Sequence, residues 1–499
     1  MLYIRMFLVM AVSLYTSRII LQNLGIANFG IYSVVGGAIG LLGFINNSMS
    51  ISVQRYLSFE LGKEDLNRVN LTFNISLAIH LIIAVSLGLF FFLCGDYITR
   101  EWLNIPPDKT VASTIFLKLI IISTGINILQ VPFMGLIIAF EKMALLAWAS
   151  IAEVILKLIV AFSISWIDYD SLIVYGYLLI AASAVSLLIF VMLSKINIRC
   201  IKIGLGWDNN LFKSLFSFAT WSALGEIAWA FTIQGVSLLL NHFVGIICNA
   251  GYGISLQISG AVNKFVGSFQ TALTPQIIKQ YASTHVEEML SLTFRGIRLS
   301  FFLLLLIALP AISGMNVILR LWLGVVPDYA VVFSQLIIIA AMTDSLSNLL
   351  ATVAKAYGHI RRYQTIVASV LFLNFPLSWL ALHLGMPAWS VTLVYCLVSL
   401  TLLYVRIRLI ERMLDMNILH IYRTSVLRRI FNVSVICAVA FSAATLLLDD
   451  NIGRLVLTSA MSLTIIPCVV YNLGMDEEEK SFVERKIKSF VTSFKTVKK

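Results

Sequence analysis

Hydrophobic stretches of about 20 residues recur along the whole chain, roughly 14 times. A helix rises about 1.5 Å per residue, so each stretch is long enough to cross a hydrocarbon core about 30 Å thick. The sequence therefore predicts an all-α polytopic membrane protein. The expected spans are residues 4–22, 30–52, 71–93, 112–138, 144–166, 172–193, 216–240, 250–272, 296–313, 331–352, 365–384, 389–405, 431–448 and 455–473.

Composition supports this class, and the placement of charge indicates the orientation. Apolar residues make up 59% of the chain and charged residues only 12%, whereas a soluble domain carries about 25% charged residues. Most Lys and Arg fall in loops on one side of the predicted spans, and the other side has Arg100, Lys109, Arg320 and Arg454. Because basic loops stay in the cytoplasm, both termini are predicted to be cytoplasmic. The net charge of +11 then favours anionic lipid headgroups and not nucleic acid.

The opening segment and the cysteines suggest neither a leader nor a metal centre. Residues 1–24 lack a small-residue cleavage site and run into a second hydrophobic span, so we expect them to form the first helix and not a signal peptide. The six cysteines are scattered without paired spacing. This pattern predicts no disulfide framework and no metal site.

A weak internal repeat, at an offset of about 220 residues, divides most of the chain into two halves. Two motifs close the second and eighth spans, and two others close the fourth and tenth. The first pair is Gln54-Arg55-Tyr56 and Gln276-Ile277-Ile278, and the second is Ala139-Phe140-Glu141-Lys142 and Ala356-Tyr357-Gly358-His359. Gly37-Ala38-Ile39 in the second span likewise corresponds to Gly260-Ala261-Val262 in the eighth. Six helices per half is an even number, so the halves have the same orientation and are related by an axis along the membrane normal.

The expected organisation is two pseudo-symmetric six-helix bundles followed by two extra helices and a tail. We assign the N-terminal bundle to residues 1–200, the C-terminal bundle to 201–405, the extra helices to 406–473 and the cytoplasmic tail to 474–499. The tail places its apolar residues on one helical face, with lysines elsewhere and acidic residues at its start. It is expected to lie as a basic amphipathic helix on the inner membrane surface.

Ionisable side chains inside the predicted spans are candidates for function, because a charge within a bilayer is costly unless it faces water or protein. Glu153 and Lys157 stand four residues apart, where they can form a structural ion pair on one helix face. Both Arg18 and Lys118 lie near helix ends, so each can either snorkel to the interface or face a central cavity. The full set is Arg18, Lys118, Glu153, Lys157, Glu226, Lys264 and Asp344.

Polar side chains also line two spans that the repeat relates. Asn46, Asn47, Gln54 and Arg55 give the second span a polar inner half, and Gln270 belongs to a polar stripe with Lys264 in the eighth. Such surfaces are expected to face water or a hydrophilic ligand. Because the intramembrane set holds four basic and three acidic residues, it favours a substrate with an anionic group such as a phosphate or carboxylate.

An enzymatic function is not indicated. The chain has no GxSxG, HExxH or Walker-type phosphate loop, and no large loop outside the membrane that could hold a catalytic site. We therefore expect no enzyme activity and no cofactor. Transport would be driven by an ion gradient acting through Asp344 or Glu226, or by the gradient of the substrate itself.

Five segments of the chain match a pattern known from other membrane proteins: Leu2-Tyr3-Ile4-Arg5-Met6, Ser13-Leu14-Tyr15-Thr16-Ser17-Arg18, Phe29-Gly30-Ile31-Tyr32-Ser33-Val34-Val35-Gly36-Gly37, Gln54-Arg55-Tyr56-Leu57-Ser58-Phe59-Glu60-Leu61-Gly62-Lys63 and Pro275-Gln276-Ile277-Ile278-Lys279. Through these segments, and over essentially its whole length, the chain resembles bacterial polysaccharide flippases of the Wzx type. That group belongs to the multidrug/oligosaccharidyl-lipid/polysaccharide (MOP) superfamily. The resemblance implies a MATE-like, alternating-access transporter of the bacterial inner membrane.

The resemblance further implies translocation of an undecaprenyl-diphosphate-linked oligosaccharide from the cytoplasmic to the periplasmic leaflet, for O-antigen (lipopolysaccharide), capsule or exopolysaccharide synthesis. Arg18, Arg55, Lys118 and Lys264, with Asn46, Asn47 and Gln270, are then the expected contacts for phosphate or glycan. Asp344 or Glu226 would take a coupling H⁺ or Na⁺. The expected partners are the lipid-linked substrate, membrane lipids and the polysaccharide polymerase machinery.

Other functions remain open on sequence alone. A multidrug extruder and a lipid II flippase belong to the same superfamily as the Wzx group. A membrane-embedded glycan polymerase or ligase should show a large outward loop with arginines, which this chain lacks. A structural partner of a polysaccharide assembly complex would tolerate charge reversal at Lys264, whereas a carrier would not.

Overall fold

The computed structural model describes scattered positions between residues 8 and 35 and then residues 43–102, 109–167, 169–198, 202–204, 206–323, 326–447, 451–481 and 484–485. Within these residues all regular structure is helical, and 11 helices are long and apolar enough to cross a membrane. The prediction of an all-α polytopic membrane protein is confirmed. Most of the first predicted span, with Arg18, and Gly37-Ala38-Ile39 of the second lie outside the described residues, as does most of the predicted tail helix.

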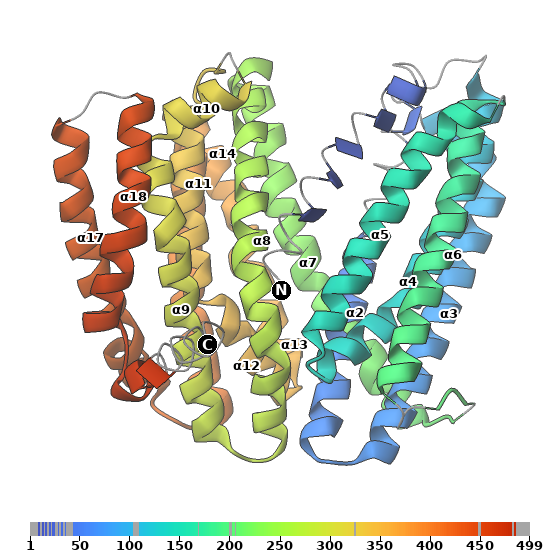
Figure 1. Cartoon of the computed structure of the whole chain (residues 1–499), viewed down its shortest axis with the longest axis horizontal. Coiled ribbons are helices and arrows are strands. Elements are labelled where there is room, and N and C mark those ends of the chain that lie inside the picture. Colours follow the sequence, from blue (N-terminus) through green and yellow to red (C-terminus); the bar gives the residue numbers. More distant parts are fainter. Residues whose placement is uncertain are drawn as a thin grey trace, which may run out of the picture. The chain divides into compact units, whose positions relative to one another are not determined.

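The helices follow one another along the chain with short connections (Figure 1). The first part contains α2 (Gly43–Gly62), α3 (Leu66–Tyr97), η1 (Ile98–Trp102), α4 (Thr110–Ala139), α5 (Met143–Ser163), η3 (Ile164–Trp166), α6 (Ser171–Asn197), α7 (Asn209–Phe243) and α8 (Ile246–Ala282). The second part contains α9 (Val286–Ser313), α10 (Met315–Leu323), α11 (Ala330–Ser345), α12 (Asn348–Tyr357), α13 (Ile360–Phe372), α14 (Asn374–His383), α15 (Ser390–Leu414), α16 (Ile418–Tyr422), η4 (Arg423–Leu427), α17 (Arg428–Leu447), α18 (Ile452–Val469) and η5 (Val470–Gly474).

Several helices extend well beyond the hydrophobic stretch that predicted them. The helix predicted at 250–272 continues to Ala282, and those predicted to begin at 216 and 296 begin at Asn209 and Val286. Hydropathy marks only the part of a helix that needs an apolar environment. The polar ends satisfy their own backbone hydrogen bonds and continue outside it, so the predicted edges were too short.

Two predicted spans are interrupted near their middles. The first gap lies between α11 and α12, at Leu346 and Ser347, and the second lies between α13 and α14 at Leu373. At the first gap the backbone N–H of Ser347 bonds to the carbonyl of Asp344 at 3.0 Å. The carbonyl of Leu346 accepts the hydroxyl of Tyr422 at 2.7 Å. Broken helices persist at membrane depth where other groups bind the freed backbone in this way.

Short polar side chains fix where some helices begin. Asp65 accepts the backbone N–H of Arg68 at the start of α3, at 2.9 Å. Asp170 accepts the N–H groups of Leu172 and Ile173 at the start of α6. These caps bind amides that a helix leaves unpaired in its first turn.

The chain divides into two compact units. Unit 1 comprises Met1–Ala230, Gly267–Leu290 and Thr352–Ser369, and unit 2 comprises Phe231–Val266, Ser291–Ala351 and Val370–Lys499. In unit 1, α4 packs against α2, α3 and α6 (Figure 1). Unit 1 also takes in most of α7, α12 and α13, the last part of α8 and the start of α9. Helices from both predicted halves of the sequence therefore meet inside unit 1.

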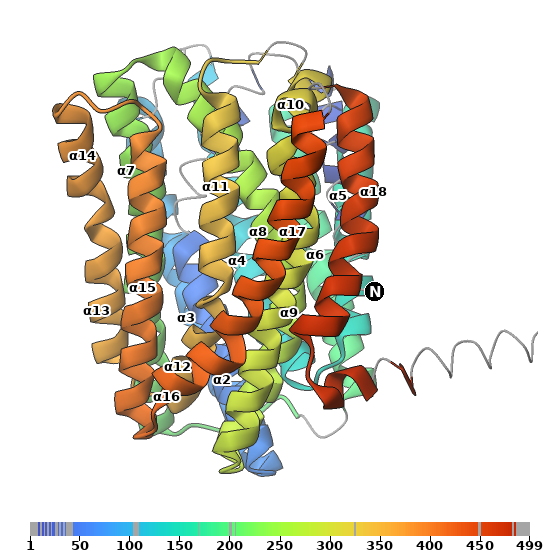
Figure 2. The same ribbon diagram turned by 90° about the vertical axis from the view of Figure 1, so that its left-hand side faces the viewer.

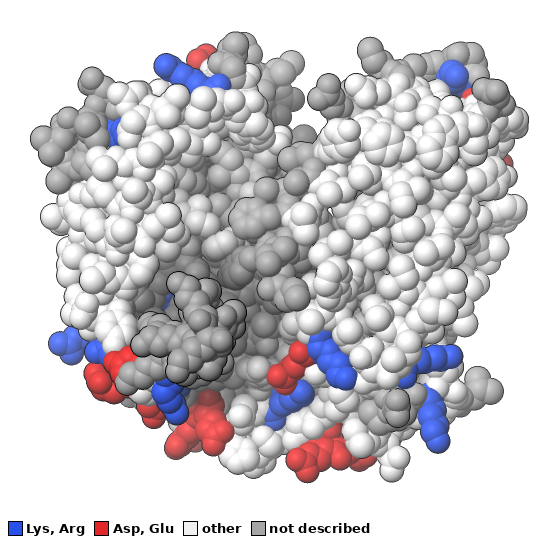
Figure 3. Space-filling view, in the orientation of Figure 1, with Lys and Arg blue, Asp and Glu red and all other residues white. Residues whose placement is uncertain are grey.

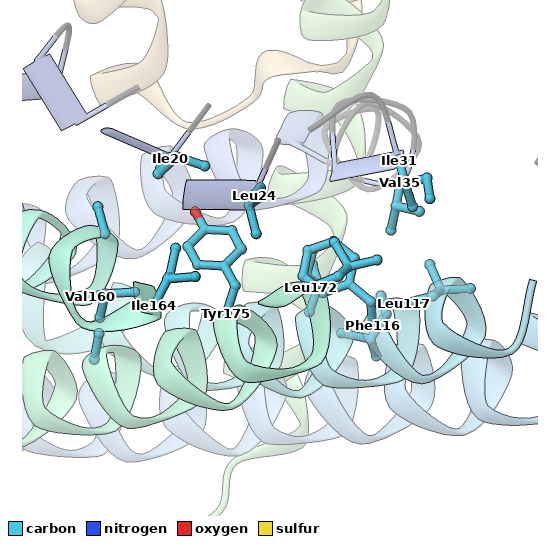
Figure 4. Close-up of a cluster of buried hydrophobic side chains, with 14 of the residues drawn as sticks. Ile20, Leu24, Ile31, Val35, Phe116, Leu117, Val160, Ile164, Leu172 and Tyr175 are labelled. Atoms are coloured by element: carbon cyan, nitrogen blue, oxygen red, sulfur yellow. The ribbon is translucent and has the colours of Figure 1, made fainter. Parts of the chain in front are cut away.

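The core of unit 1 is built from branched and aromatic side chains at helix contacts. Phe116 and Leu117 of α4 point toward Leu172 and Tyr175 of α6, and all four are buried (Figure 4). A Cβ atom at Gly176 would lie 2.7 Å from Leu119 Cδ1. The missing side chain lets α4 and α6 approach closely, which is how membrane helices commonly pack.

In unit 2, α15 packs against α11 and α14, and α17 packs against α18 (Figure 2). The described start of the tail is attached to this unit. Asp476 and Glu479 both accept hydrogen bonds from Arg298 Nη2 of α9, at 2.7 and 2.8 Å. The backbone N–H of Asp476 also donates to Glu479 Oε2 at 2.8 Å, as in a capping box.

On the face that Figure 3 shows, the described Lys, Arg, Asp and Glu side chains gather at the helix ends. Lys264 on α8 and the Glu153–Lys157 pair on α5 lie between the ends of their helices. We call one end of the unit 1 helices the basic end. It holds the α2–α3, α4–α5, α8–α9 and α12–α13 turns, which are among the loops that the sequence predicts to be cytoplasmic.

Candidate functional site

One face of α8 is polar and open. It consists of residues spaced three and four apart, and a Cβ atom added at any of its three glycines would meet no other atom within 4 Å. Gln257, Gly260 and Lys264 on this face are exposed. Gln270, three residues after Gly267, is half-buried. The face comprises Gly253, Gln257, Gly260, Lys264 and Gly267.

The exposed faces of other spans have the opposite character. On α3 the side chains of Val85, Leu89 and Phe92 are 61%, 59% and 65% exposed. On α5 the exposed residues include Trp148 and Ile159. Apolar exposed faces suit contact with lipid, whereas a polar face inside a membrane span has to meet water, protein or a hydrophilic ligand. The α8 face is therefore a candidate substrate surface.

The predicted polar half of α2 is only partly open. Asn47 is exposed, whereas Asn46 and Gln54 are half-buried. Asn46 Oδ1 and Gln54 Nε2 are buried and have no hydrogen-bond partner among the described residues. The hydroxyl of Ser52 donates to the carbonyl of Leu215 at 3.0 Å, so the opposite side of α2 packs on α7. Unpaired buried polar atoms are uncommon and are satisfied when a water or ligand binds.

Arg55, a predicted substrate contact, is engaged with the protein itself. Its side chain is buried, and Nε and Nη2 donate to the carbonyls of Lys355 and Ala356, each at 3.1 Å. The guanidinium carbon lies 4.5 Å from the ring centre of Tyr56 and 4.6 Å from that of Phe59. Arg55 thus occupies the carbonyl end of α12, and in this structure its donors are not open to a ligand.

Glu141, in the α4–α5 turn, is held in a comparable way by α8. Lys279 Nζ donates to Glu141 Oε1 at 2.6 Å, and Gln276 Nε2 donates to Oε2 at 3.0 Å. Burial opposes ionisation of Glu141, but these two hydrogen bonds and the charge of Lys279 outweigh it and hold the pKa of the carboxyl below its ordinary value. The sequence had singled out Glu141 and Gln276 only as repeat motifs.

Asp344 lies at the end of α11, beside the interruption before α12. Its Oδ2 accepts the hydroxyl of Tyr395 at 2.7 Å, and Arg406 donates to the nearby Ser347 hydroxyl at 2.7 Å. The backbone carbonyl of Asp344 accepts the N–H of Ser347. An acidic side chain next to a broken helix is an arrangement that can hold a small cation or a proton.

The remaining predicted residues do not converge on one point. Lys157 Nζ lies 2.7 Å from Glu153 Oε1, as an ion pair on α5. Lys118 pairs with Asp96 at 3.3 Å, a partner that no sequence pattern indicated. Glu226 on α7 is half-buried and makes no ion pair with a described residue. Among the residues that the structure describes, no three His, Cys, Asp or Glu side chains lie close enough to hold a metal ion.

Similarity to solved structures decides the fold. A crystal structure of a MATE mutant aligns with a TM-score of 0.74 and 12% identity, over 83% of this chain and 96% of that one. The chain has the MATE transporter fold. An outward-facing multidrug resistance MATE family transporter of the MOP superfamily aligns with a TM-score of 0.71 and 12% identity, over 83% and 95% of the two chains.

A third structure of the same fold is the MATE transporter ClbM in complex with Rb⁺. It aligns with a TM-score of 0.65 and 16% identity, over 81% of this chain and 94% of that one. No protein-family model matches the sequence, and no curated protein matches it. At such low identities the similarity establishes the MATE fold and leaves the substrate to be argued from this chain's own residues.

Proposed function

We propose that this protein is a transporter that moves an undecaprenyl-diphosphate-linked oligosaccharide from the cytoplasmic to the periplasmic leaflet of a bacterial inner membrane, with both termini in the cytoplasm. The observation that carries the proposal is the open polar face of α8, with Lys264 among glycines and Gln257. A lipid-linked sugar needs such a surface because its pyrophosphate and hydroxyl groups have to avoid hydrocarbon.

The chemistry of the face supports a large polar substrate better than a small apolar one. Three glycines leave backbone accessible over several helical turns, and Gln257 and Gln270 offer both donors and acceptors to hydroxyl groups. Lys264 supplies a positive charge for a phosphate oxygen. The polyprenyl chain would remain in lipid beside apolar faces such as that of α3.

Energy for transport would come from an ion gradient. Asp344, with Tyr395 beside it and the helix interruption next to it, is the better candidate for the coupling cation or proton. Glu226 is the second candidate, because no basic partner neutralises it among the described residues. The Rb⁺ complex of ClbM is in keeping with cation binding in this fold.

The test compares cells with and without the protein. The amount and sidedness of undecaprenyl-diphosphate-linked oligosaccharide are measured by mass spectrometry and outer-leaflet labelling. Deletion should cause accumulation on the cytoplasmic side, which wild type relieves and Lys264→Glu does not. The matched control is Lys213→Glu, the same charge reversal at an exposed position of α7, which should still relieve it. Unchanged lipid-linked sugar after deletion would contradict the proposal.

A multidrug extruder is the second candidate, because a transporter with this fold is described as conferring multidrug resistance. Extrusion of amphiphilic cations would require the acidic groups, Asp344 and Glu226, to contact substrate, and Lys264 would repel it. Drug susceptibility of the same strains separates the two functions. Hypersensitivity that Lys264→Glu still relieves would favour extrusion.

A further inference from the structure

Two contacts at the basic end join motifs that the sequence repeat relates. Arg55, from the motif that closes α2, binds the carbonyls of Lys355 and Ala356, from the motif that closes α12. Gln276, from the motif that closes α8, binds Glu141, from the motif that closes α4. In each contact, the second predicted span of one half binds the end of the fourth predicted span of the other half. The two contacts are therefore reciprocal.

The turns at this end repeat in the same register. In the α2–α3 turn Glu64 has φ 60°, and in the α8–α9 turn Thr284, 220 residues later, has φ 64°. Their backbone bonds match as well, because Asp65 N–H bonds to Glu60 O and His285 N–H bonds to Gln280 O. Glu141 and Gly358 occupy the left-handed position of the α4–α5 and α12–α13 turns, with φ 59° and 93°.

Glycines let both contacts form at short range. A Cβ atom at Gly62 would lie 2.6 Å from the carbonyl oxygen of Lys279, and one at Gly358 would collide with Arg55 Nη2. The aromatic rings of Phe59, Tyr281 and Tyr357 lie beside the same helix ends, with centroids 6.5 Å and 6.2 Å apart along the series. The helix ends are thus packed together without room for another side chain.

We infer that these two contacts form a clasp that holds the basic end closed and separates whenever that end opens. The clasp comprises Arg55 with the carbonyl end of α12, and Glu141 with Gln276 and Lys279. Both contacts lie outside the most apolar parts of the spans. When the contacts separate, water can therefore hydrogen-bond to the polar groups that they release. Among the described residues, the hydrogen bonds of Arg55 go to two uncharged carbonyls, and water or an anion can replace a carbonyl as its partner.

This inference rests on the proposed transport function in one respect, because it assumes that the basic end opens during transport. Its test therefore measures how fast a reagent that arrives from the basic end reaches α2, and it does not involve the sugar substrate. The six cysteines are replaced by serine, and Asn47→Cys is introduced on the exposed side of α2, two helical turns from Arg55. Reaction with a membrane-impermeant maleimide is followed in inverted vesicles. Glu64→Cys, in the exposed α2–α3 turn, reports that the basic end faces the reagent.

Arg55→Ala and Glu141→Lys should each raise the labelling rate at position 47 roughly tenfold or more, because each removes charge-assisted hydrogen bonds that exist only in the closed form. Gly358→Ala should also raise the rate, because the added methyl group displaces the guanidinium and because the left-handed backbone at φ 93° disfavours alanine. The control is Arg68→Ala, which breaks an exposed ion pair with Asp208 at the same end and should leave the rate unchanged.

Reversal of charge distinguishes opening from loss of folding. Glu141→Lys combined with Lys279→Glu restores the pair with opposite signs and should return labelling to the wild-type rate. Equal rates in Arg55→Ala and Arg68→Ala, or a double variant that labels as fast as Glu141→Lys alone, would overturn the clasp. If the labelling results agree with the clasp but deletion leaves the lipid-linked sugar unchanged, only the proposed substrate is overturned.

Discussion

Two buried arginines in this protein are held in different ways. Arg298 of α9 is 3% exposed and binds Asp476 and Glu479, two carboxylates at the start of the tail. Arg55 of α2 is 6% exposed and binds two backbone carbonyls. The first arginine forms ion pairs with its partners, whereas the second forms none with a residue that the structure describes.

The difference separates a permanent attachment from a releasable one. A buried ion pair is expensive to break, because each partner is left as an uncompensated charge. A guanidinium on neutral carbonyls loses much less when water takes their place. Arg298 therefore suits an anchor that fixes the start of the tail to α9, and Arg55 suits a contact that can form and break, as the proposed clasp requires.

The largest expected effect is that of Arg298→Ala. Removing the guanidinium takes their buried partner from Asp476 and Glu479, although Arg429 still pairs with Asp476 and Arg295 lies 4.0 Å from Glu479. Breaking a buried ion pair costs about 3–5 kcal/mol, and the lower end of that range is expected here. Thermal unfolding of the purified protein in detergent should show a large fall in Tm. The control is Lys480→Ala, since Lys480 pairs with Glu477, whose side chain is 92% exposed; there about 1 kcal/mol or less is expected.

Arg55→Ala should destabilise the closed form less, by about 1.5–3 kcal/mol for hydrogen bonds made by a charged group. Arg55→Lys keeps the charge but loses the planar fork that reaches two carbonyls, so it should recover only part of the loss. The measurement is again Tm in detergent. If Arg55→Ala lowered Tm as much as Arg298→Ala, Arg55 would be an anchor and the contrast between the two arginines would fail.

The stabilisation from Glu141 should depend on pH. Its folded-state pKa lies below the ordinary value of 4.5 because Lys279 and Gln276 outweigh burial. A lowered pKa contributes stability above 4.5, and that stability is lost as pH falls through the folded value. The Tm difference between wild type and Glu141→Gln should therefore be present at neutral pH and shrink below about pH 4.5. A constant difference down to pH 3 would contradict the ion pair.

The smallest effect is expected for Arg68→Ala. The pKa of Asp208 is lowered mainly by the backbone N–H groups of Leu211 and Asn210, and only afterwards by Arg68. Both side chains of this pair are substantially exposed, and such pairs contribute little. No measurable change in Tm is expected. A clear fall would show that exposed pairs at the basic end also stabilise the fold, and would weaken the use of this variant as a control.

Much of the fold could be predicted because each membrane span is marked by a continuous hydrophobic stretch of the sequence. Each described helix of bilayer length overlaps an expected span, and the polar side of α8 around Lys264 was visible in its residues. The interruption between α11 and α12 was not. No Pro or Gly marks Leu346, and the bond that accommodates its carbonyl comes from Tyr422, 76 residues away.

The site was harder to predict than the fold, because its partners are distant in sequence. Arg55 looked like a free cation in a polar half-span, and nothing local showed that carbonyls some 300 residues on would bind it. The motifs at Glu141 and Gln276 were recognised as repeats. Only the spatial arrangement showed that repeated motifs bind each other crosswise and not within one half.

The interruption after α11 also bears on how small this protein can be made. A chain shortened at Asp415 would keep both predicted six-helix bundles and lose only the later helices. It would also lose Tyr422, which is fully buried, packs against Phe294 and donates to the Leu346 carbonyl. That carbonyl would then have no donor in the middle of a membrane helix. The short helix α16, which carries Tyr422, is thus a structural requirement of the helices before it, and trimming the chain at Asp415 would leave a buried backbone carbonyl unpaired.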